Sequence, residues 1–443
     1  MDIERIFTDP KRPPDCTQGD MARLIPVMDW KETHLLGFFL AALQAIPTFS
    51  RTILDLVDGP KGKSQNVECF TEVVFKTDKQ QESRCDGLIV VRRGKSEWRA
   101  IVEAKIGNSE IDGPQIEKYL RLARENRIDA VLTISNEFVP RPTDSPVKIS
   151  GLLTRSVKLF HLSWWTLLTE ALLAQHNAKS LSTTEEFLIG ELLRACLHPK
   201  SKIIGFSQMH KGWKDTVSKV QSNSLQKSDP DSEATATDWV QEQKELALIL
   251  SRNIGKKAAL WQSSKHREPT ALRKAIINSL TQRGLLSCQI RVADVAGPIE
   301  IRSEVKNRRH LIYMKLRAPE DKVSGKARLN WLLRQLAKCK DERVTIFCLW
   351  PGNAAPSHRK LSELRTDPDA LLADRPTATP HSFEIALIDD LGSRYAMPKV
   401  FIERLETACL AFYNDVAVNL RAWQPPAPKP VVVELEGHAR NDH

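Results

Sequence analysis

The sequence predicts an α/β protein, in which a mixed central sheet flanked by helices is followed by a second, α+β domain. Three observations lead to this expectation. Helical and strand-like segments alternate through the first 200 of the 443 residues, a polar segment at 218–238 interrupts the apolar pattern, and a new series of helices and strands follows it. With 41% hydrophobic and 27% charged residues, the composition is that of a globular chain long enough for several domains.

These features divide the chain into four parts. We expect a first domain at 1–200, a connector at 201–238, a basic α+β domain at 239–423 and a mobile, proline-rich tail at 424–443. Charge separates the two domains, because residues 1–200 hold 27 Lys and Arg against 27 Asp and Glu, whereas the rest holds 38 against 28. The whole net charge of +10 therefore lies after residue 200.

In the first domain, the spacing of apolar residues predicts a helix at Trp30–Ile46 with Asp29 as its N-cap. Three strands rich in β-branched residues come next, then a helix, a strand, a proline-rich loop, another strand and two helices. Their expected bounds are Val67–Lys76, Arg84–Val91, Trp98–Ala104, Pro114–Asn126, Ala130–Ile134, 139–146, Val157–Leu162, Trp164–Ala174 and Glu185–Leu197. This order implies a mixed sheet covered by helices.

In the second domain, two helices are expected first, then a meander of three strands, an amphipathic helix, two further strands and a last helix. Their expected bounds are Trp239–Trp261, Thr270–Gln282, Ser287–Val292, Ile299–Val305, His310–Leu316, Ala327–Lys338, Val344–Trp350, Ser382–Ile388 and Lys399–Asn414. Strands and helices in this order predict an α+β domain.

Several classes of protein are excluded at this stage. The longest mostly apolar stretch, Leu35–Ile46, has 12 residues, fewer than the roughly 20 of a membrane-spanning helix. The N-terminus starts with acidic residues and lacks the apolar core of a secretory signal, so we expect a cytoplasmic protein with no membrane partner. The eight cysteines include no C-x-x-C pair and no phosphate-binding glycine loop is present, which argues against a zinc site and a nucleotide-driven motor.

Chemically reactive side chains concentrate in the predicted hairpin at 84–105. Asp86 begins one apolar strand and Glu103 ends the next, so the hairpin brings the two carboxylates to one end of the sheet. Glu103 and Lys105 are two positions apart and therefore point to the same face of a strand. Asp86, Glu103 and Lys105 are expected to converge. The alternative is an exposed Glu–Lys pair at a strand end and a turn aspartate.

Such a group suits the hydrolysis of a phosphodiester bond. The carboxylates of Asp86 and Glu103 and the main-chain carbonyl of Ala104 are hard oxygen ligands for Mg²⁺, or for Mn²⁺ in its place. The ion would lower the pKa of a bound water, and Lys105 would position that water and stabilise the pentavalent state. Asp86, Glu103 and Lys105 are thus candidate catalytic residues.

The motif and its setting resemble the PD-(D/E)xK, or restriction-endonuclease-like, nuclease superfamily. A helix, three antiparallel strands that carry Asp and then Glu-x-Lys, and a following helix and strand match its core over about residues 28–200. Gln115 and Tyr119 open the helix after the motif, which is similar to the Q-x-x-x-Y signature of several branches. Cys85 stands where the name-giving proline would be. The resemblance implies a nuclease domain at 1–200 with a metal-dependent active site.

The resemblance also implies further site residues. Glu32 lies on the first helix, where many members carry a glutamate that completes the metal site, and Glu72, within a strand, is the other candidate. A glutamate in a first helical turn also complements the helix dipole, and Glu72 fits a solvent-facing strand position. Gln115 is expected to act in catalysis. Tyr119 either contacts the nucleic acid or belongs to the core of a capped amphipathic helix.

The second domain carries two basic segments. Residues 244–284 hold nine basic and two acidic side chains, and residues 299–345 hold thirteen and six. Nucleic acid, with DNA favoured, is the expected partner. The candidate phosphate contacts are Lys256, Lys257, Lys326 and Arg328. The alternatives are solvated helix faces and a homodimer interface built on the apolar face of the helix at Ala327–Lys338.

The expected function is a Mg²⁺-dependent nuclease that hydrolyses phosphodiester bonds of DNA. The alternative is a protein that keeps the nuclease fold, has lost activity and binds nucleic acid or a protein partner. A lone nuclease domain joined to an unfamiliar basic domain is similar in architecture to effector nucleases of bacterial anti-phage or mobile-element systems, where protein partners are expected. Repair or recombination is the other expected setting.

Overall fold

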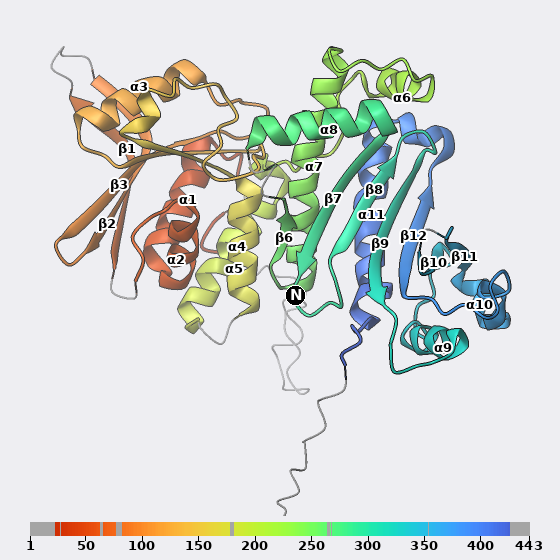
Figure 1. Ribbon diagram of the computed structural model, residues 1–443. Helices are drawn as coiled ribbons and strands as arrows, with labels where there is room; N and C mark the ends of the chain where they lie inside the picture. Colours follow the sequence, from red (N-terminus) through yellow and green to blue (C-terminus); the bar gives the residue numbers. More distant parts are fainter. Residues whose placement is uncertain are drawn as a thin grey trace, which may run out of the picture.

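The computed structural model describes residues 23–26, 28–62, 65–76, 82–177, 181–263, 266, 268–352 and 354–425. It contains two sheets, each with helices packed against it (Figure 1). Residues up to Ile203 pack around the first sheet, and residues from Phe206 onward pack around the second. The mixed α/β class predicted from the order of the elements is confirmed.

The first sheet has five strands in the order β1-β2-β3-β4-β5. Their bounds are β1 (Asn66–Lys76), β2 (Glu82–Arg93), β3 (Ser96–Ala104), β4 (Ala130–Ser135) and β5 (Lys158–Ser163). The first three strands pair antiparallel as consecutive neighbours, whereas β3, β4 and β5 run parallel. Parallel strands need a crossover between them, and a helix supplies it after β3.

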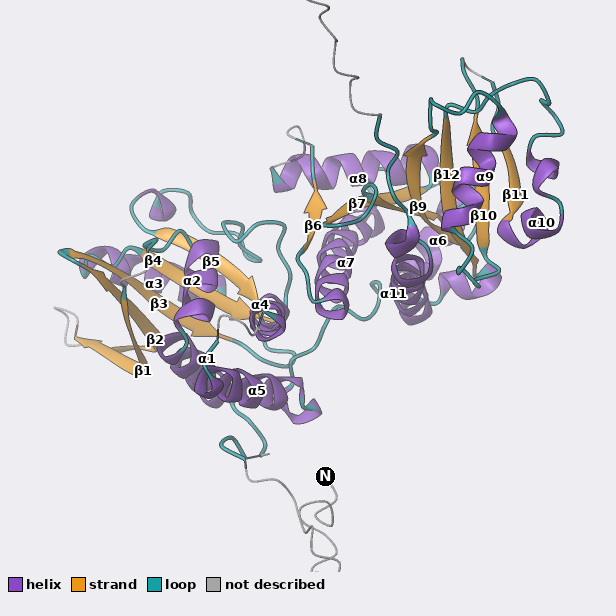
Figure 2. Cartoon of the chain, turned by 90° about the horizontal axis from the view of Figure 1, so that it is seen from below, coloured by secondary structure: helices purple, strands orange, loops and turns teal. Residues whose placement is uncertain are grey.

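Helices cover both faces of this sheet. One face packs against α1 (Glu32–Ala45), α2 (Pro47–Leu56), α4 (Trp164–His176) and α5 (Thr183–Leu197), and the other packs against α3 (Gly113–Glu125). The strands β3 and β4 alternate accordingly, since Val102 and Leu132 contact the first group of helices while Ile101 and Val131 contact α3. Figure 2 shows these helices around the sheet.

The start of the first helix differs from the prediction. The helix begins at Glu32, with Lys31 rather than Asp29 at the N-cap position. The main-chain N–H of Lys31 donates to Nδ1 of His34 at 3.2 Å, so a side chain inside the helix satisfies this amide. Trp30 is buried ahead of the helix. The helix α2 was not predicted, although its buried Phe, Ile and Leu residues recur at helical spacing.

The second sheet has seven strands in the order β11-β10-β12-β9-β8-β7-β6, and all neighbours are antiparallel. Their bounds are β6 (Ala258–Trp261), β7 (Leu285–Val292), β8 (Ile299–Glu304), β9 (Arg309–Arg317), β10 (Val344–Leu349), β11 (Ser357–Lys360) and β12 (Ser382–Asp390). The prediction lacked the short strands β6 and β11 at the two edges. Each of them has four residues, too few for a clear alternating pattern.

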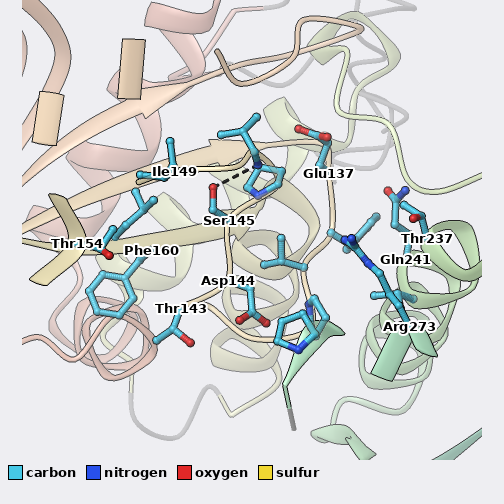
Figure 3. A pocket seen from close by; sticks show the side chains of 18 of the residues that line it. Glu137, Thr143, Asp144, Ser145, Ile149, Thr154, Phe160, Thr237, Gln241 and Arg273 are labelled. Carbon is cyan, nitrogen blue, oxygen red and sulfur yellow. Dashed lines mark hydrogen bonds between the residues drawn. The ribbon is translucent and has the colours of Figure 1, made fainter. Parts of the chain in front are cut away.

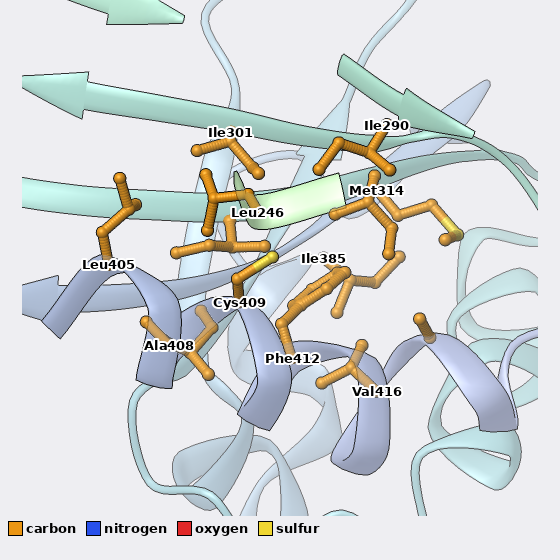
Figure 4. Packing of buried hydrophobic residues seen from close by; sticks show 14 of the residues in the cluster. Leu246, Ile290, Ile301, Met314, Ile385, Leu405, Ala408, Cys409, Phe412 and Val416 are labelled. Carbon is orange, nitrogen blue, oxygen red and sulfur yellow. The ribbon is translucent and has the colours of Figure 1, made fainter. Parts of the chain in front are cut away.

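One face of the second sheet forms the larger hydrophobic core. The helices of this part are α6 (Trp213–Gln221), α7 (Pro230–Ile254), α8 (Pro269–Arg283), α9 (Gly325–Gln335), α10 (Leu361–Thr366) and α11 (Pro398–Asp415), and all contribute to this core. Figure 4 shows Leu405, Cys409 and Phe412 of α11 packed against Ile301 and Ile385 of the strands. The opposite face carries a smaller apolar cluster centred on Tyr313.

The predicted connector at 201–238 is wrong. Within it, α6 begins at Trp213 and α7 begins at Pro230, and both helices pack into the second core. The prediction from composition failed because the buried residues in the first turns of α7, Ser232 and Thr235, are small and polar, and such residues also occur in linkers. The second core therefore starts before residue 239.

The predicted helix Trp239–Trp261 also ends differently. Gly255 follows α7 in the left-handed conformation, with φ of 65°, and this conformation stops the helix. The chain then enters β6. In α9, Leu329 and Leu332 are buried in the core, so the apolar face expected at a homodimer interface is already covered within the chain.

Residues 1–22 and most of the predicted tail, 426–443, lie outside the described residues. Within the described ranges, no single helix combines the length and the apolarity needed to cross a membrane. The pair α1 and α2 meets these criteria only when the two helices are joined, and they meet at a bend of 111°.

Candidate active site

The structure brings Asp86, Glu103 and Lys105 together at one end of the β2–β3 hairpin. The last ladder pair is Gly87–Val102, which leaves Asp86 opposite Glu103. Oδ2 of Asp86 accepts a hydrogen bond from the main-chain N–H of Ala104 at 3.0 Å. The ammonium of Lys105 donates to Oε1 of Glu103 at 2.7 Å. The predicted convergence of the three side chains is therefore present.

The two further glutamates occupy different surroundings. Glu32, in the first turn of α1, has its carboxylate 3.6 Å from Nζ of Lys105. Glu72 on β1 instead forms an ion pair with Arg84 at 2.9 Å. The first helix thus places the carboxylate of Glu32 beside Lys105, and its role as a metal ligand remains a prediction.

Burial dominates the electrostatics of Glu103, whose side chain is 1% exposed. Burial and the negative charge of Asp86, partly offset by Lys105, raise the pKa of Glu103 to about 7. For Lys105, burial alone would lower the pKa. The hydrogen bond and charge of Glu103, with the charges of Glu32 and Asp86, outweigh burial and raise it, so Lys105 is held as a cation.

The oxygen atoms of the site are of the kind that bind a divalent ion. Oε2 of Glu103 is buried and has no hydrogen-bond partner among the described residues, which leaves a desolvated anionic oxygen at the site. Within the same residues, no group of three His, Cys, Asp or Glu side chains is arranged to hold a metal ion. Mg²⁺ is usually held by one or two carboxylates, with the other positions filled by water and phosphate. Asp86 and Glu103 fit that kind of site.

Gln115 and Tyr119 connect α3 to the strand that carries Asp86. Nε2 of Gln115 donates to the hydroxyl of Tyr119 at 3.1 Å, and this hydroxyl donates to the main-chain carbonyl of Arg84 at 3.1 Å. Burial and then the charge of Glu103 raise the pKa of Tyr119, so the hydroxyl stays neutral. Tyr119 is buried in the core between α3, to which it belongs, and the sheet, whereas Gln115 is half-buried.

Sequence reasoning missed Trp164 as a site residue and placed it in the core only. Trp164 is indeed buried, but its indole N–H also donates to the main-chain carbonyl of Lys105 at 2.8 Å. The N–H of Lys105 donates to the carbonyl of Ile134 at 2.8 Å. Both main-chain groups of Lys105 are therefore fixed, one by β4 and one by α4.

A row of buried polar residues continues from Glu103 across the parallel strands. In the ladder, Glu103 lies opposite Thr133, which lies opposite His161. Oγ1 of Thr133 and Nδ1 of His161 are 2.9 Å apart, and Nε2 of His161 lies 3.0 Å from the carbonyl of Glu137. Burial lowers the pKa of His161 to about 4, so it is neutral. The sequence feature that could have identified Thr133 and His161 is a single polar residue in the interior of each apolar strand.

The four basic residues predicted to contact phosphates are each held by contacts within the chain. Lys256, Lys257 and Lys326 form ion pairs with Asp294, Glu170 and Asp369, and Arg328 donates to the carbonyls of Lys322 and Pro380. The first two precede β6 and the last two belong to α9. The four candidates thus come from two separate elements of the chain, and their contact with phosphates remains a prediction.

A cavity of 590 Å³ lies at the junction of the two parts, away from the candidate catalytic residues. It lies between the loop after β4 and the helices α7 and α8 (Figure 3). Glu137 and Arg273 are among the charged residues that line it, and Oε2 of Glu137 has no hydrogen-bond partner among the described residues. Burial raises the pKa of Glu137. None of the predicted site residues lines this cavity.

Comparison with protein-family models, curated proteins and solved structures returned no match to the chain. Function is therefore inferred from the chain's own residues. The arrangement of Asp86, Glu103 and Lys105 offers two carboxylates for a hard cation and an ammonium for an anionic substrate.

Proposed function

We propose that the chain is a metal-dependent nuclease with a restriction-endonuclease-like core, which hydrolyses phosphodiester bonds, with DNA as the favoured substrate. One observation carries the proposal. A buried glutamate, Glu103, meets Asp86 and Lys105 at a sheet end, and one of its carboxylate oxygens has no hydrogen-bond donor among the described residues. A buried oxygen without a partner is costly, and a divalent ion beside Asp86 and Glu103 would compensate that cost in a way that the Lys105 ammonium on the other oxygen does not.

Each residue of the site has a chemical task in this proposal. Asp86 and Glu103 would hold Mg²⁺, or Mn²⁺ in its place, with the main-chain carbonyl of Ala104 as a further oxygen ligand. When bound, the ion supplies an acidified water and neutralises charge on the phosphate oxygens. Lys105 holds a positive charge where the anionic phosphorane forms, and its fixed main chain limits the positions that its ammonium reaches.

Gln115 and Glu32 complete the proposed site. The Gln115 amide donates to the Tyr119 hydroxyl, which in turn donates to the carbonyl of Arg84 on the strand that carries Asp86. We assign it the orientation of the scissile phosphate. Glu32 lies 3.6 Å from Nζ of Lys105 and balances its charge in the absence of substrate.

Cleavage of supercoiled plasmid DNA with and without Mg²⁺ tests the proposal. Asp86→Asn, Glu103→Gln and Lys105→Met are each expected to lower the cleavage rate by about 10² or more, because each removes a ligand or the cation at the reacting phosphate. Glu125→Gln is the matched control, since Glu125 is an exposed carboxylate at the end of α3. Equal cleavage by the wild type and the three site variants would overturn the assignment.

The same variants distinguish the proposed function from the alternative, a protein that keeps the nuclease fold without activity. Mg²⁺ would then bind without cleavage, or not bind at all. Thermal unfolding with Mg²⁺ and no DNA reads out binding alone. A midpoint raised by Mg²⁺ in the wild type but not in Asp86→Asn, with no cleavage of DNA or RNA by either protein, would favour the inactive form.

A further inference from the structure

The second sheet turns one face towards its helices, and its other face carries the small apolar cluster of Leu311, Tyr313 and Ala386. Figure 1 shows β7, β8, β9 and β12 in front of α11. Along β8, Ile299 and Ile301 are buried in the core with the helices, whereas Glu300 and Arg302 point to the other side and are half-buried. We call this other side the open face; it is formed by the residues of the seven strands that alternate away from the helical core.

One continuous ladder row crosses the whole open face. The row begins at Trp261 on β6, passes through Glu300 on β8 and Tyr313 on β9, and ends at Lys360 on β11. Seven strands at about 4.8 Å spacing give it a length of roughly 29 Å. Trp261 and Lys360 at its two ends are exposed, whereas Tyr313, Ala386 and Thr345 in its middle are buried. An extended polymer laid across the strands would therefore meet accessible side chains mainly towards the two edges.

Three cations on the open face have no carboxylate partner among the described residues. The guanidinium of Arg291 lies over the ring of Trp261, 5.3 Å from its centroid. Arg302 lies over the ring of Tyr313 at 5.0 Å and donates to its hydroxyl at 2.7 Å. Lys360 is exposed on the edge strand β11. The aromatic rings hold the two guanidiniums in place, and neither forms a direct ion pair among the described residues, although the charge of Arg302 also acts on the nearby Glu384.

The carboxylates of the open face are already engaged. Glu304 pairs with Arg309 at 2.7 Å, and Glu384 lies 3.7 Å from Lys315. Glu300 accepts a hydrogen bond from the hydroxyl of Tyr313 at 2.8 Å. Glu304 and Glu384 thus pair with cations, whereas Glu300 bonds to a neutral hydroxyl that also accepts from Arg302. Arg291, Arg302 and Lys360 remain without a direct ion pair among the described residues, so the face presents an excess of cations.

Aromatic rings are accessible at both edges of the row. Trp261 is 43% exposed on β6. At the opposite edge, the ring of His358 stacks on Phe347, with centroids 5.2 Å apart and planes 25° from parallel, and His358 is exposed. Exposed rings between unpaired cations are the combination that binds single-stranded nucleic acid, since bases stack on the rings and phosphates pair with the cations.

We propose that the open face binds single-stranded nucleic acid, with bases on Trp261 and His358 and phosphates on Arg291, Arg302 and Lys360. The inference deepens the proposed nuclease function. It rests on that function for one step, because other polyanions could also bind exposed cations and the proposed function is the reason to choose nucleic acid. A second copy of the chain fits less well, because two such faces would bring unpaired cations together. The predicted contact residues Lys256, Lys257, Lys326 and Arg328 are replaced by this set.

Fluorescence anisotropy with a labelled 20-nucleotide oligo-dT, in EDTA, measures binding without cleavage. The variant Arg291→Gln/Arg302→Gln/Lys360→Gln is expected to bind at least tenfold more weakly than the full-length wild type. Its slope of log K against log salt is expected to be shallower by about 2, since three phosphate contacts on a single strand are removed. The control Lys256→Gln/Lys257→Gln/Lys326→Gln loses the same charge elsewhere and is expected to bind within twofold of the wild type.

His358→Ala is a second, less disruptive variant, expected to weaken binding about tenfold through the lost stacking. Equal weakening by both triple variants would overturn the proposal, because charge alone would then explain binding. Unchanged binding by the open-face triple and His358→Ala would also overturn it, as would a wild-type dimer that the open-face triple makes monomeric in sedimentation with unchanged DNA binding. Binding through the open face without any Mg²⁺-dependent cleavage would overturn the nuclease function but keep this inference.

Discussion

Glu72 and Asp86 are the two residues at which the ladder between β1 and β2 is interrupted, between the pairs Thr71–Gly87 and Val73–Cys85, and the backbone of Glu72 has the left-handed conformation, with φ of 55°. Cys69 and Val73 lie on either side of Glu72, four residues apart, and would share one face of a regular strand. Instead, Cys69 packs towards α1 and Val73 packs towards α3. The distortion at Glu72 therefore reverses the faces of β1 beside the candidate catalytic aspartate, as strand irregularities near active sites often do.

Replacing Glu72 tests whether this conformation positions Asp86. Glu72→Val is expected to lower stability by about 1–3 kcal/mol and cleavage by tenfold or more, because a β-branched residue disfavours positive φ. Glu72→Gly removes the same carboxylate but accepts the conformation, so its cleavage rate should stay within a few-fold of the wild type. Urea unfolding and plasmid cleavage measure the two effects. Equal activity of both variants would show that the backbone at this position does not matter for Asp86.

Trp164 is expected to act on catalysis through Lys105. Trp164→Phe keeps a large buried ring but loses the 2.8 Å hydrogen bond to the carbonyl of Lys105. We expect stability to fall by about 1 kcal/mol and the rate constant for cleavage to fall about tenfold, with the Kd for DNA unchanged. Single-turnover kinetics separates the rate constant from binding. Trp213→Phe is the control for the loss of a buried hydrogen bond, because it removes the bond from the indole N–H to the carbonyl of Tyr395 in the other core. It should leave the rate constant unchanged.

Arg252 is expected to be a main support of the junction between the two parts of the chain. It lies over the ring of Trp165 on α4, 4.2 Å from the centroid, and donates to Glu245 at 2.9 Å. Glu245 is buried, so Arg252→Met leaves an uncompensated charge and should destabilise the protein by about 3–5 kcal/mol. The double variant Arg252→Met/Glu245→Leu should recover most of this loss. Thermal unfolding of both variants measures the coupling, and simple additivity would contradict it.

Glu406 on α11 should make stability depend on pH. Burial raises the pKa of Glu406 to about 7, and the charge of Glu245 adds to this effect. Because the folded-state pKa lies above the ordinary value of 4.5, this carboxyl costs nothing in acid, and its cost grows as pH rises from 4.5 to about 7 and then stays constant. Glu406→Gln should thus match the wild type below pH 4.5 and exceed its stability above pH 7 by up to roughly 3 kcal/mol.

Denaturant unfolding at pH 4 and pH 8 measures this difference. Glu403→Gln, an exposed carboxylate on the same helix, is the matched control and should show no such change between the two pH values. A difference between Glu406→Gln and the wild type that is the same at both pH values would mean that the ionisation of Glu406 is not linked to folding.

Local pattern was enough to predict most of the strands and helices and the convergence of Asp86, Glu103 and Lys105. Alternating β-branched residues marked β2 and β3, and a short polar turn between them required a hairpin. A hairpin sets which residues lie opposite each other, so the carboxylates had to meet once the strands were recognised. Lys105 followed from its spacing to Glu103 alone.

The connector, the supporting residues and the open face depended on contacts between distant segments. Polar residues at 218–238 became helical because the second core offered α6 and α7 a surface to pack on, and composition does not record such a surface. Trp164 reaches Lys105 across 59 positions of the chain.

The sequence by itself determined how many basic residues the second part holds, and only the tertiary structure decided which of them keep an unpaired charge. Lys326 forms an ion pair with Asp369, 43 positions further along the chain, whereas Arg302 lies over the ring of Tyr313 on the neighbouring strand and donates to its hydroxyl. Ion pairing depends on distances of a few ångströms between side chains, and these distances are set by the packing of the strands and helices, not by the order of the residues.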